Sequence, residues 1–173
     1  MKKIFATAGL AAALICPALG ASAQNKPAEK ASQKFIVKAV EGNLAEVQMG
    51  QLAQEKAGSD SVRSFGQMLQ QDHSAAAQSS TTVATQIGVT PPSEPNKQQK
   101  ALHQSLSKLS GEAFDRKFTA EMVKDHKKEI AEYKKMAKKQ NDASGAYASQ
   151  TLPTLQKHLE MAQSLTKGSG KTR

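Results

Sequence analysis

The chain has a single cysteine, Cys16, in 173 residues, and this residue lies in a segment that we expect to be removed. Two lysines at the start precede an apolar run over 4–19 and small residues ending at Ala23, which is the order of a secretory signal peptide. The apolar run is shorter than the ~20 residues that a membrane span needs. We therefore expect cleavage of residues 1–23 and a periplasmic or secreted mature chain without disulfides or thiolate metal ligands.

Aromatic residues are scarce, at 4% of the chain, although the chain carries a net charge of +9. Without Lys2 and Lys3 the mature charge is about +7, which favours solubility or contact with an anionic envelope surface. The lysines between 127 and 139 recur at helical spacing, as on a solvated helix face. Because stacking aromatics usually accompany basic nucleic-acid sites, we expect no nucleic-acid binding.

Alternating β-branched runs are almost absent, whereas Ala, Gln, Lys, Leu and Met, which favour helices, dominate. The composition predicts an all-α fold, a four-helix bundle over 33–166, between a flexible lead-in at 24–32 and a disordered tail at 167–173. A long crossover with three prolines, carrying a short helix at about 96–109, separates the second and third long helices. Pro153 predicts a kink or restart in the last helix. The expected long helices cover about 33–56, 60–86, 112–140 and 142–166.

Sequence motifs of common enzymes are also missing. The chain has no Gly-rich phosphate loop, no Ser-His-Asp arrangement and no pair of carboxylates at a spacing suited to glycoside chemistry. The sequence therefore favours a protein without turnover. One further hypothesis is a metal-dependent oxidase or hydrolase. Such an enzyme would need an open coordination position at the metal and a cleft.

The most informative feature of the sequence is a short motif that occurs twice. Phe65-Gly-Gln-Met-Leu-Gln-Gln-Asp72-His73 is followed 53 residues later by Phe118-Thr-Ala-Glu-Met-Val-Lys-Asp125-His126. Each copy has Phe eight residues before His and Asp directly before His. The repeat predicts two helices that face one another across a shared site.

Helical periodicity brings further polar residues toward the apolar faces of the expected helices. Imidazole and carboxylate side chains on facing helices can hold one transition-metal ion, such as Zn, Fe, Mn, Ni or Cu. Asp72 and Asp125 point about 100° away from the adjacent histidines, so they suit outer partners of ligands better than ligands. The alternative is a metal-free structural or interaction module, in which the Asp-His pairs are buried hydrogen-bond networks that fix helix register. The candidate ligands are Glu46, His73, His126, Glu129 and His158.

The chain resembles the bacterial exported family known as domain of unknown function 4142, a ferritin-like group. The resemblance is carried by Gly42-Asn-Leu-Ala-Glu46, Phe65 with Asp72-His73-Ser74, Gly111-Glu-Ala-Phe114-Asp115, Met122-Val-Lys-Asp125-His126 and Leu152-Pro153-Thr-Leu155-Gln-Lys-His158. It implies a ferritin-like four-helix fold and export, and it implies no activity.

The ferritin-like pattern fits this chain in part. Glu46 matches the carboxylate of the first helix, but Gln70 and Leu155 stand where glutamates would precede the histidines of the pattern. The likeness therefore implies a single histidine-rich metal site, or no metal site, rather than a di-iron centre. Our leading hypothesis is an exported envelope protein that binds a transition metal or acts in stress protection, and the sequence leaves open whether it forms a homo-oligomer.

Overall fold

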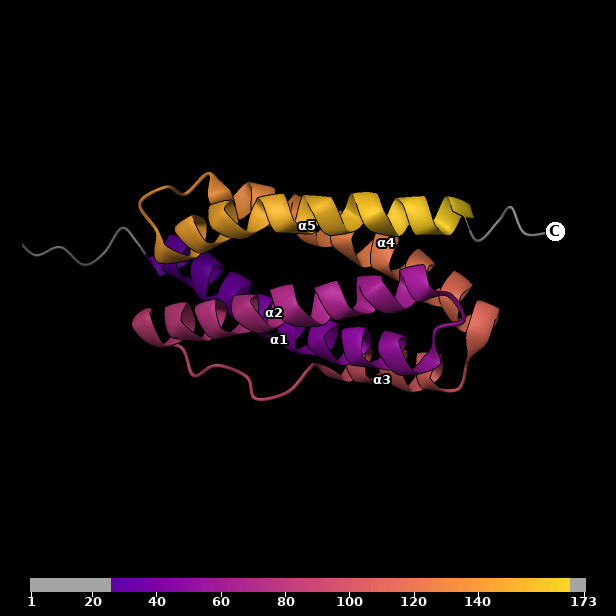
Figure 1. The fold of residues 1–173 in the computed structure, drawn as a ribbon. Coiled ribbons are helices and arrows are strands. Elements are labelled where there is room, and N and C mark those ends of the chain that lie inside the picture. The colour runs from indigo at the N-terminus through magenta and orange to yellow at the C-terminus, as the bar shows by residue number, and fades with distance from the viewer. Residues whose placement is uncertain (1–25, 169–173) are drawn as a thin grey trace, which may run out of the picture.

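The computed structural model describes residues 26–168, and the expected signal peptide 1–23 and residues 169–173 lie outside this range. Within it the chain forms five helices (Figure 1) and no strand. The all-helical expectation is confirmed, and no helix in this range is long and apolar enough to cross a membrane. The helices are α1 (Lys26–Lys56), α2 (Asp60–Gln86), α3 (Lys97–Ser107), α4 (Gly111–Ala137) and α5 (Ala143–Gly168).

The four long helices pack lengthwise as two hairpins, α1 with α2 and α4 with α5 (Figure 1). The hairpins join through contacts of α2 with α5 and of α1 with α4. Ser59 caps α2, where its side chain accepts a hydrogen bond from the Val62 N–H. Asp115 of α4 accepts hydrogen bonds from the N–H groups of Gly58 and Ser59. These bonds fix the turn between α1 and α2 against α4.

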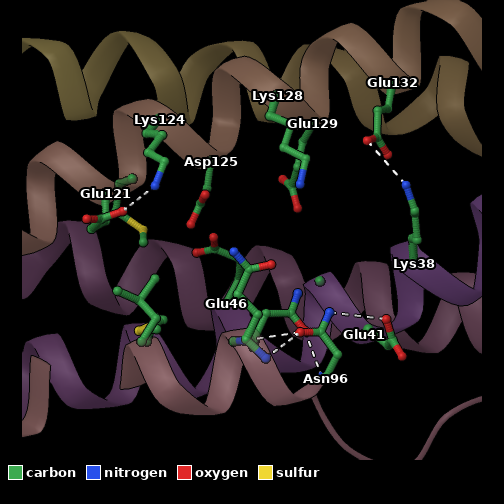
Figure 2. A pocket seen from close by; sticks show the side chains of 17 residues that line it. Lys38, Glu41, Glu46, Asn96, Glu121, Lys124, Asp125, Lys128, Glu129 and Glu132 are labelled. Atoms are coloured by element: carbon green, nitrogen blue, oxygen red, sulfur yellow. Dashed lines mark hydrogen bonds and ion pairs between the residues drawn. The ribbon is translucent and has the colours of Figure 1, made fainter. Parts of the chain in front are cut away.

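The crossover between the hairpins carries α3, which lies against α1 and α4. Asn96 caps α3 with a capping box, and its Nδ2 donates to Glu41 Oε2 of α1 over 3.3 Å. A cleft of about 510 Å³ opens between α1, the start of α3 and α4 (Figure 2). The short helix expected within the crossover is therefore present, and it forms one wall of this cleft.

One expectation about helix bounds is wrong, and a second is wrong in part. Helix α1 starts at Lys26, so residues 26–32 continue a helix rather than form a flexible lead-in. Lys, Ala and Glu favour helices, Pro27 suits a first turn, and Ser32 donates a hydrogen bond to Asp142 of the other hairpin. Helix α5 continues through Pro153, so the predicted restart is wrong, whereas the predicted kink stays a prediction. Proline removes one helical hydrogen bond, and the buried Tyr147 and Leu155 on either side hold the helix in place.

Glycines allow α1 and α2 to approach closely. A Cβ at Gly50 would lie 2.5 Å from the Gly66 carbonyl oxygen, and a Cβ at Gly66 would lie 2.7 Å from the Ala53 Cβ. Neither distance is compatible with a side chain. The contact fixes α1 against α2 about two turns from the polar residues described below.

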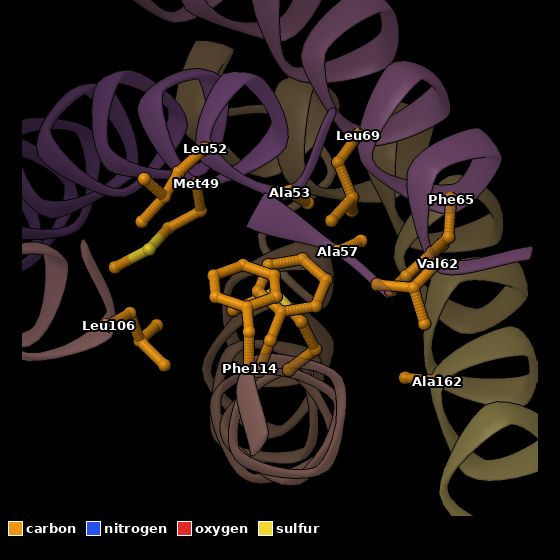
Figure 3. Close-up of a cluster of buried hydrophobic side chains, with 12 residues drawn as sticks. Met49, Leu52, Ala53, Ala57, Val62, Phe65, Leu69, Leu106, Phe114 and Ala162 are labelled. Carbon is orange, nitrogen blue, oxygen red and sulfur yellow. The ribbon is translucent and has the colours of Figure 1, made fainter. Parts of the chain in front are cut away.

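The interior consists of two hydrophobic clusters at opposite ends of the bundle axis. The first surrounds Phe65, Phe114 and Phe118 (Figure 3), and the second surrounds Phe35, Tyr133 and Tyr147. On each long helix at least one buried polar residue lies in sequence between the members of the two clusters. We call this the polar layer, and its buried members include Asn43, Glu46, His73, Ser80, His126 and His158.

Candidate metal centre

Three histidines from three helices meet in the polar layer. His73 of α2, His126 of α4 and His158 of α5 are each at most 2% exposed. Their ring centroids lie 5.2 to 5.8 Å apart. One nitrogen from each ring lies within 4.8 Å of the other two, so the three rings surround a common point.

The two copies of the repeated sequence motif lie opposite one another across this point. The rings of His73 and His126 have centroids 5.8 Å apart, and those of Phe65 and Phe118 lie 6.2 Å apart. Each hairpin contributes one copy, and equivalent residues of the two copies meet. The expectation that the two copies face one another is confirmed.

Asn43 of α1 fixes the protonation of the first ring. Its Nδ2 group donates to Ser80 Oγ over 3.2 Å and to Tyr147 Oη over 2.8 Å, so its Oδ1 is left as an acceptor. Ser80 donates its own proton to the Ala77 carbonyl, which supports this orientation. His73 Nδ1–H therefore donates to Asn43 Oδ1 over 2.9 Å, and His73 Nε2 carries a lone pair.

The other two rings also have one nitrogen each beside an acceptor. His126 Nδ1–H donates to the Met122 carbonyl over 3.0 Å. His158 Nε2–H donates to Asp72 Oδ2 over 2.9 Å. Asp72 thus lies where an outer partner of a ligand would, although it contacts the histidine of α5 rather than its sequence neighbour His73.

The three remaining ring nitrogens all carry lone pairs and converge. His73 Nε2 has no hydrogen-bond partner, and His126 Nε2 lies 3.4 Å from His158 Nδ1. Two lone pairs at this distance repel unless a cation or proton lies between them. Two imidazole nitrogens on a tetrahedral zinc ion, each at 2.0–2.1 Å, would stand about 3.3–3.4 Å apart.

Burial keeps these rings neutral. Burial, with the neighbouring His126 and His158, holds the pKa of His73 well below 6.5. Burial, with His158 nearby, lowers the pKa of His126 to about 4. Burial also lowers the pKa of His158, although Asp72 opposes this effect. Neutral imidazole is the form that binds metal ions.

The two glutamates of the predicted ligand set lie elsewhere. Glu46 and Glu129 line the cleft between α1, α3 and α4, together with Asp125 (Figure 2). Burial, with Glu129 and Asp125 nearby, raises the pKa of Glu46 well above 4.5. Burial, with Asp125 and Glu132 nearby, raises the pKa of Glu129 to about 8. The structure thus brings together three of the five predicted ligands and places the other two in a second group.

Sequence reasoning missed the groups that orient the rings. Helical periodicity alone assigns no role to Asn43, Tyr147 or the Met122 carbonyl. Asn43 had one available signal, because an amide on an otherwise apolar helix face requires partners for its polar atoms.

Comparison with known proteins gives one match. A family model described as a domain of unknown function, DUF4142, matches residues 17–165. No curated protein and no solved structure matches the chain.

Proposed function

Because the chain belongs to the DUF4142 family, whose description names no activity, we propose from the geometry of the three histidines that this protein binds one transition-metal ion. The ligands are His73 Nε2, His126 Nε2 and His158 Nδ1. We further propose that the mature protein is exported and that its long helices form a ferritin-like four-helix bundle with α3 in the crossover. A stress-protective role would follow from holding a reactive metal in the envelope.

One observation carries this proposal. Each ring has its outer nitrogen beside an acceptor of the protein, and its inner nitrogen is directed at the space that the other two share. Acceptors behind metal-bound imidazoles orient the rings and raise their basicity. A network that served structure alone would not need three convergent lone pairs in a buried layer.

The donor set narrows the class of metal. Three neutral imidazoles suit zinc, copper, nickel and iron, whereas manganese prefers carboxylate and water oxygens. Zinc with three histidine ligands keeps a fourth position for water or another small ligand. The His126 and His158 nitrogens are already 3.4 Å apart, so binding requires little movement of these two rings.

Metal analysis of the mature protein, purified without a histidine tag, tests the proposal. We expect close to one equivalent of metal, or uptake of one equivalent of added zinc or copper, and loss of binding in His73→Ala and in His126→Ala. Glu46→Gln serves as the comparison and should keep the metal, because Glu46 lies in the cleft. Folded protein that binds none of zinc, copper, iron, manganese or nickel would refute the proposal.

The competing proposal is a metal-free structural module. It is favoured by the hydrogen bonds that the layer makes between helices, from α5 to α2 through His158 and Asp72 and from α2 to α1 through His73 and Asn43. The first contact joins the two hairpins without an ion, and the second joins the two helices of the first hairpin. The unpartnered His73 Nε2 counts against this proposal, since a buried nitrogen without a partner is costly.

A further inference from the structure

The cleft between α1, α3 and α4 has a charge opposite to that of the chain. Its walls carry six carboxylates and three lysines, although the whole chain has a net charge of +9. A locally negative cleft in a basic protein concentrates cations. The carboxylates belong to Glu41, Glu46, Glu121, Asp125, Glu129 and Glu132.

Glu46 lies deepest in this group and has no partner for one of its oxygens. The residue is 5% exposed, lines the cleft and is directed toward Asp125 (Figure 2), and its Oε2 accepts no hydrogen bond. Glu129 Oε2 is likewise buried without a partner. Two buried oxygens without a partner that line the same cleft are available to a cation as ligands.

A glycine makes room for one of these carboxylates. A Cβ at Gly42 would lie 3.0 Å from Glu129 Oε1, so α1 has no side chain where the carboxylate of α4 approaches it. Two of the lysines of the cleft face other partners. Lys38 lies 3.4 Å from Glu132, and Lys124 lies 3.4 Å from Glu121, at the two ends of the cleft.

We propose that this cleft binds one oxygen-preferring divalent cation, calcium or magnesium, between the carboxylates of Glu46, Asp125 and Glu129. The donor set contains only oxygen, which these ions prefer and which separates this site from the histidine centre. Among residues 26–168, only the three histidines bring three ligand atoms within 4.8 Å of one another. The wider spacing of the carboxylates suits an ion that keeps part of its water shell, as magnesium does.

Calorimetric titration of the mature protein with calcium and with magnesium tests this inference. We expect one ion per chain for at least one of the two metals, and affinity at least tenfold weaker in Glu46→Gln. Glu129→Gln is the second variant and should also lose at least tenfold, so that the result does not depend on one substitution.

Two further variants identify the site. Glu55→Gln removes the same charge from an exposed position of α1 and should bind within twofold of the unmodified protein. His73→Ala should also keep its calcium or magnesium, so failure of the histidine centre and failure of this site are distinguishable. No binding of either ion by the folded protein, or unchanged binding in Glu46→Gln and Glu129→Gln, would overturn the proposal.

Discussion

The histidine centre and the carboxylate cleft are neighbours on the same helices, yet they satisfy their buried polar atoms in different ways. Asn43 and Glu46 are one turn apart on α1, and His126 and Asp125 are adjacent on α4. Each imidazole donates to an acceptor of the protein, whereas Glu46 and Glu129 each keep an unpartnered oxygen. Burial is therefore common to both groups, and only the histidines have been given fixed protein partners.

The pKa values of the two groups shift in opposite directions. Burial lowers the pKa values of the histidines and raises those of Glu46 and Glu129. Both groups therefore favour the uncharged state of their side chains. The histidines reduce stability as the pH falls below 6.5, and Glu129 reduces it as the pH rises from 4.5 to about 8. Substitutions in one group therefore separate its contribution from that of the other.

The largest expected effect comes from removing a histidine. His126→Ala should lower the free energy of unfolding of the metal-free protein by about 3 kcal/mol, because it leaves a cavity in a fully buried layer and leaves the Met122 carbonyl without its donor. Urea unfolding in the presence of a chelator measures this loss.

Two other substitutions serve as comparisons for the loss of stability in His126→Ala. His103→Ala, at a partly exposed position of α3, should change stability by no more than about 0.5 kcal/mol. Glu46→Gln should leave stability unchanged or raise it, because it removes a buried carboxylate without a donor. A loss in Glu46→Gln equal to that in His126→Ala would erase the distinction between the two groups.

A smaller effect should separate the two aspartates. Asp72→Asn removes the charge behind His158 and should weaken zinc binding by about 10- to 100-fold. Asp125→Asn alters the cleft and should change zinc affinity by less than about twofold, since Asp125 lines the cleft and not the histidine centre. Competition titration with a chromophoric chelator gives both affinities. Equal weakening in the two variants would show that the centre and the cleft act as one site.

An effect of similar size is a difference in pH dependence, measured by urea unfolding of the metal-free protein. His126 has a folded pKa of about 4, so the unfolded chain binds its proton first as the pH falls below 6.5, and stability is lost toward lower pH. From pH 6.5 to pH 5 this loss is about 2 kcal/mol. Glu129 acts in the opposite sense. Its folded pKa of about 8 means that the native state binds the proton first, and stability is gained over the same interval.

The variant Glu129→Gln removes this opposing contribution. Between pH 6.5 and pH 5 it should lose about 2 kcal/mol more stability than the unmodified protein does. Identical pH profiles of the two proteins would contradict the opposition between the groups.

The helices were predictable from local chemistry, and their exceptions arise from tertiary packing. Gly58 and Gly88 lie at or beyond the ends of α1 and α2, as their conformational freedom suggests. Pro153 predicts an interruption of the helix when only its neighbours in sequence are considered, but the buried residues around it keep α5 continuous. The polar composition of residues 26–32 predicted a flexible lead-in, but Ser32 contacts Asp142, which directly precedes α5 and lies 110 residues further along the chain.

The histidines were predictable because they recur in a repeat, whereas their partners were not. Helical arithmetic gives the angle of a residue around its own helix and says nothing about which neighbouring helix it faces. Glu46 and Asn43 are therefore indistinguishable by periodicity, although one lines the cleft and the other orients His73. For the same reason Glu129 was grouped with His126, one turn away on α4.

Because the polar layer separates the two hydrophobic clusters, we expect the protein to unfold as two cooperative units. Each hydrophobic cluster draws on all four long helices, so each end of the bundle can keep its packing while the other end opens. Hydrogen exchange should therefore reveal two sets of amides whose protection falls off toward opposite ends of the molecule. An ion held by α2, α4 and α5 at the boundary would stabilise both units at once and convert two local openings into a single global one.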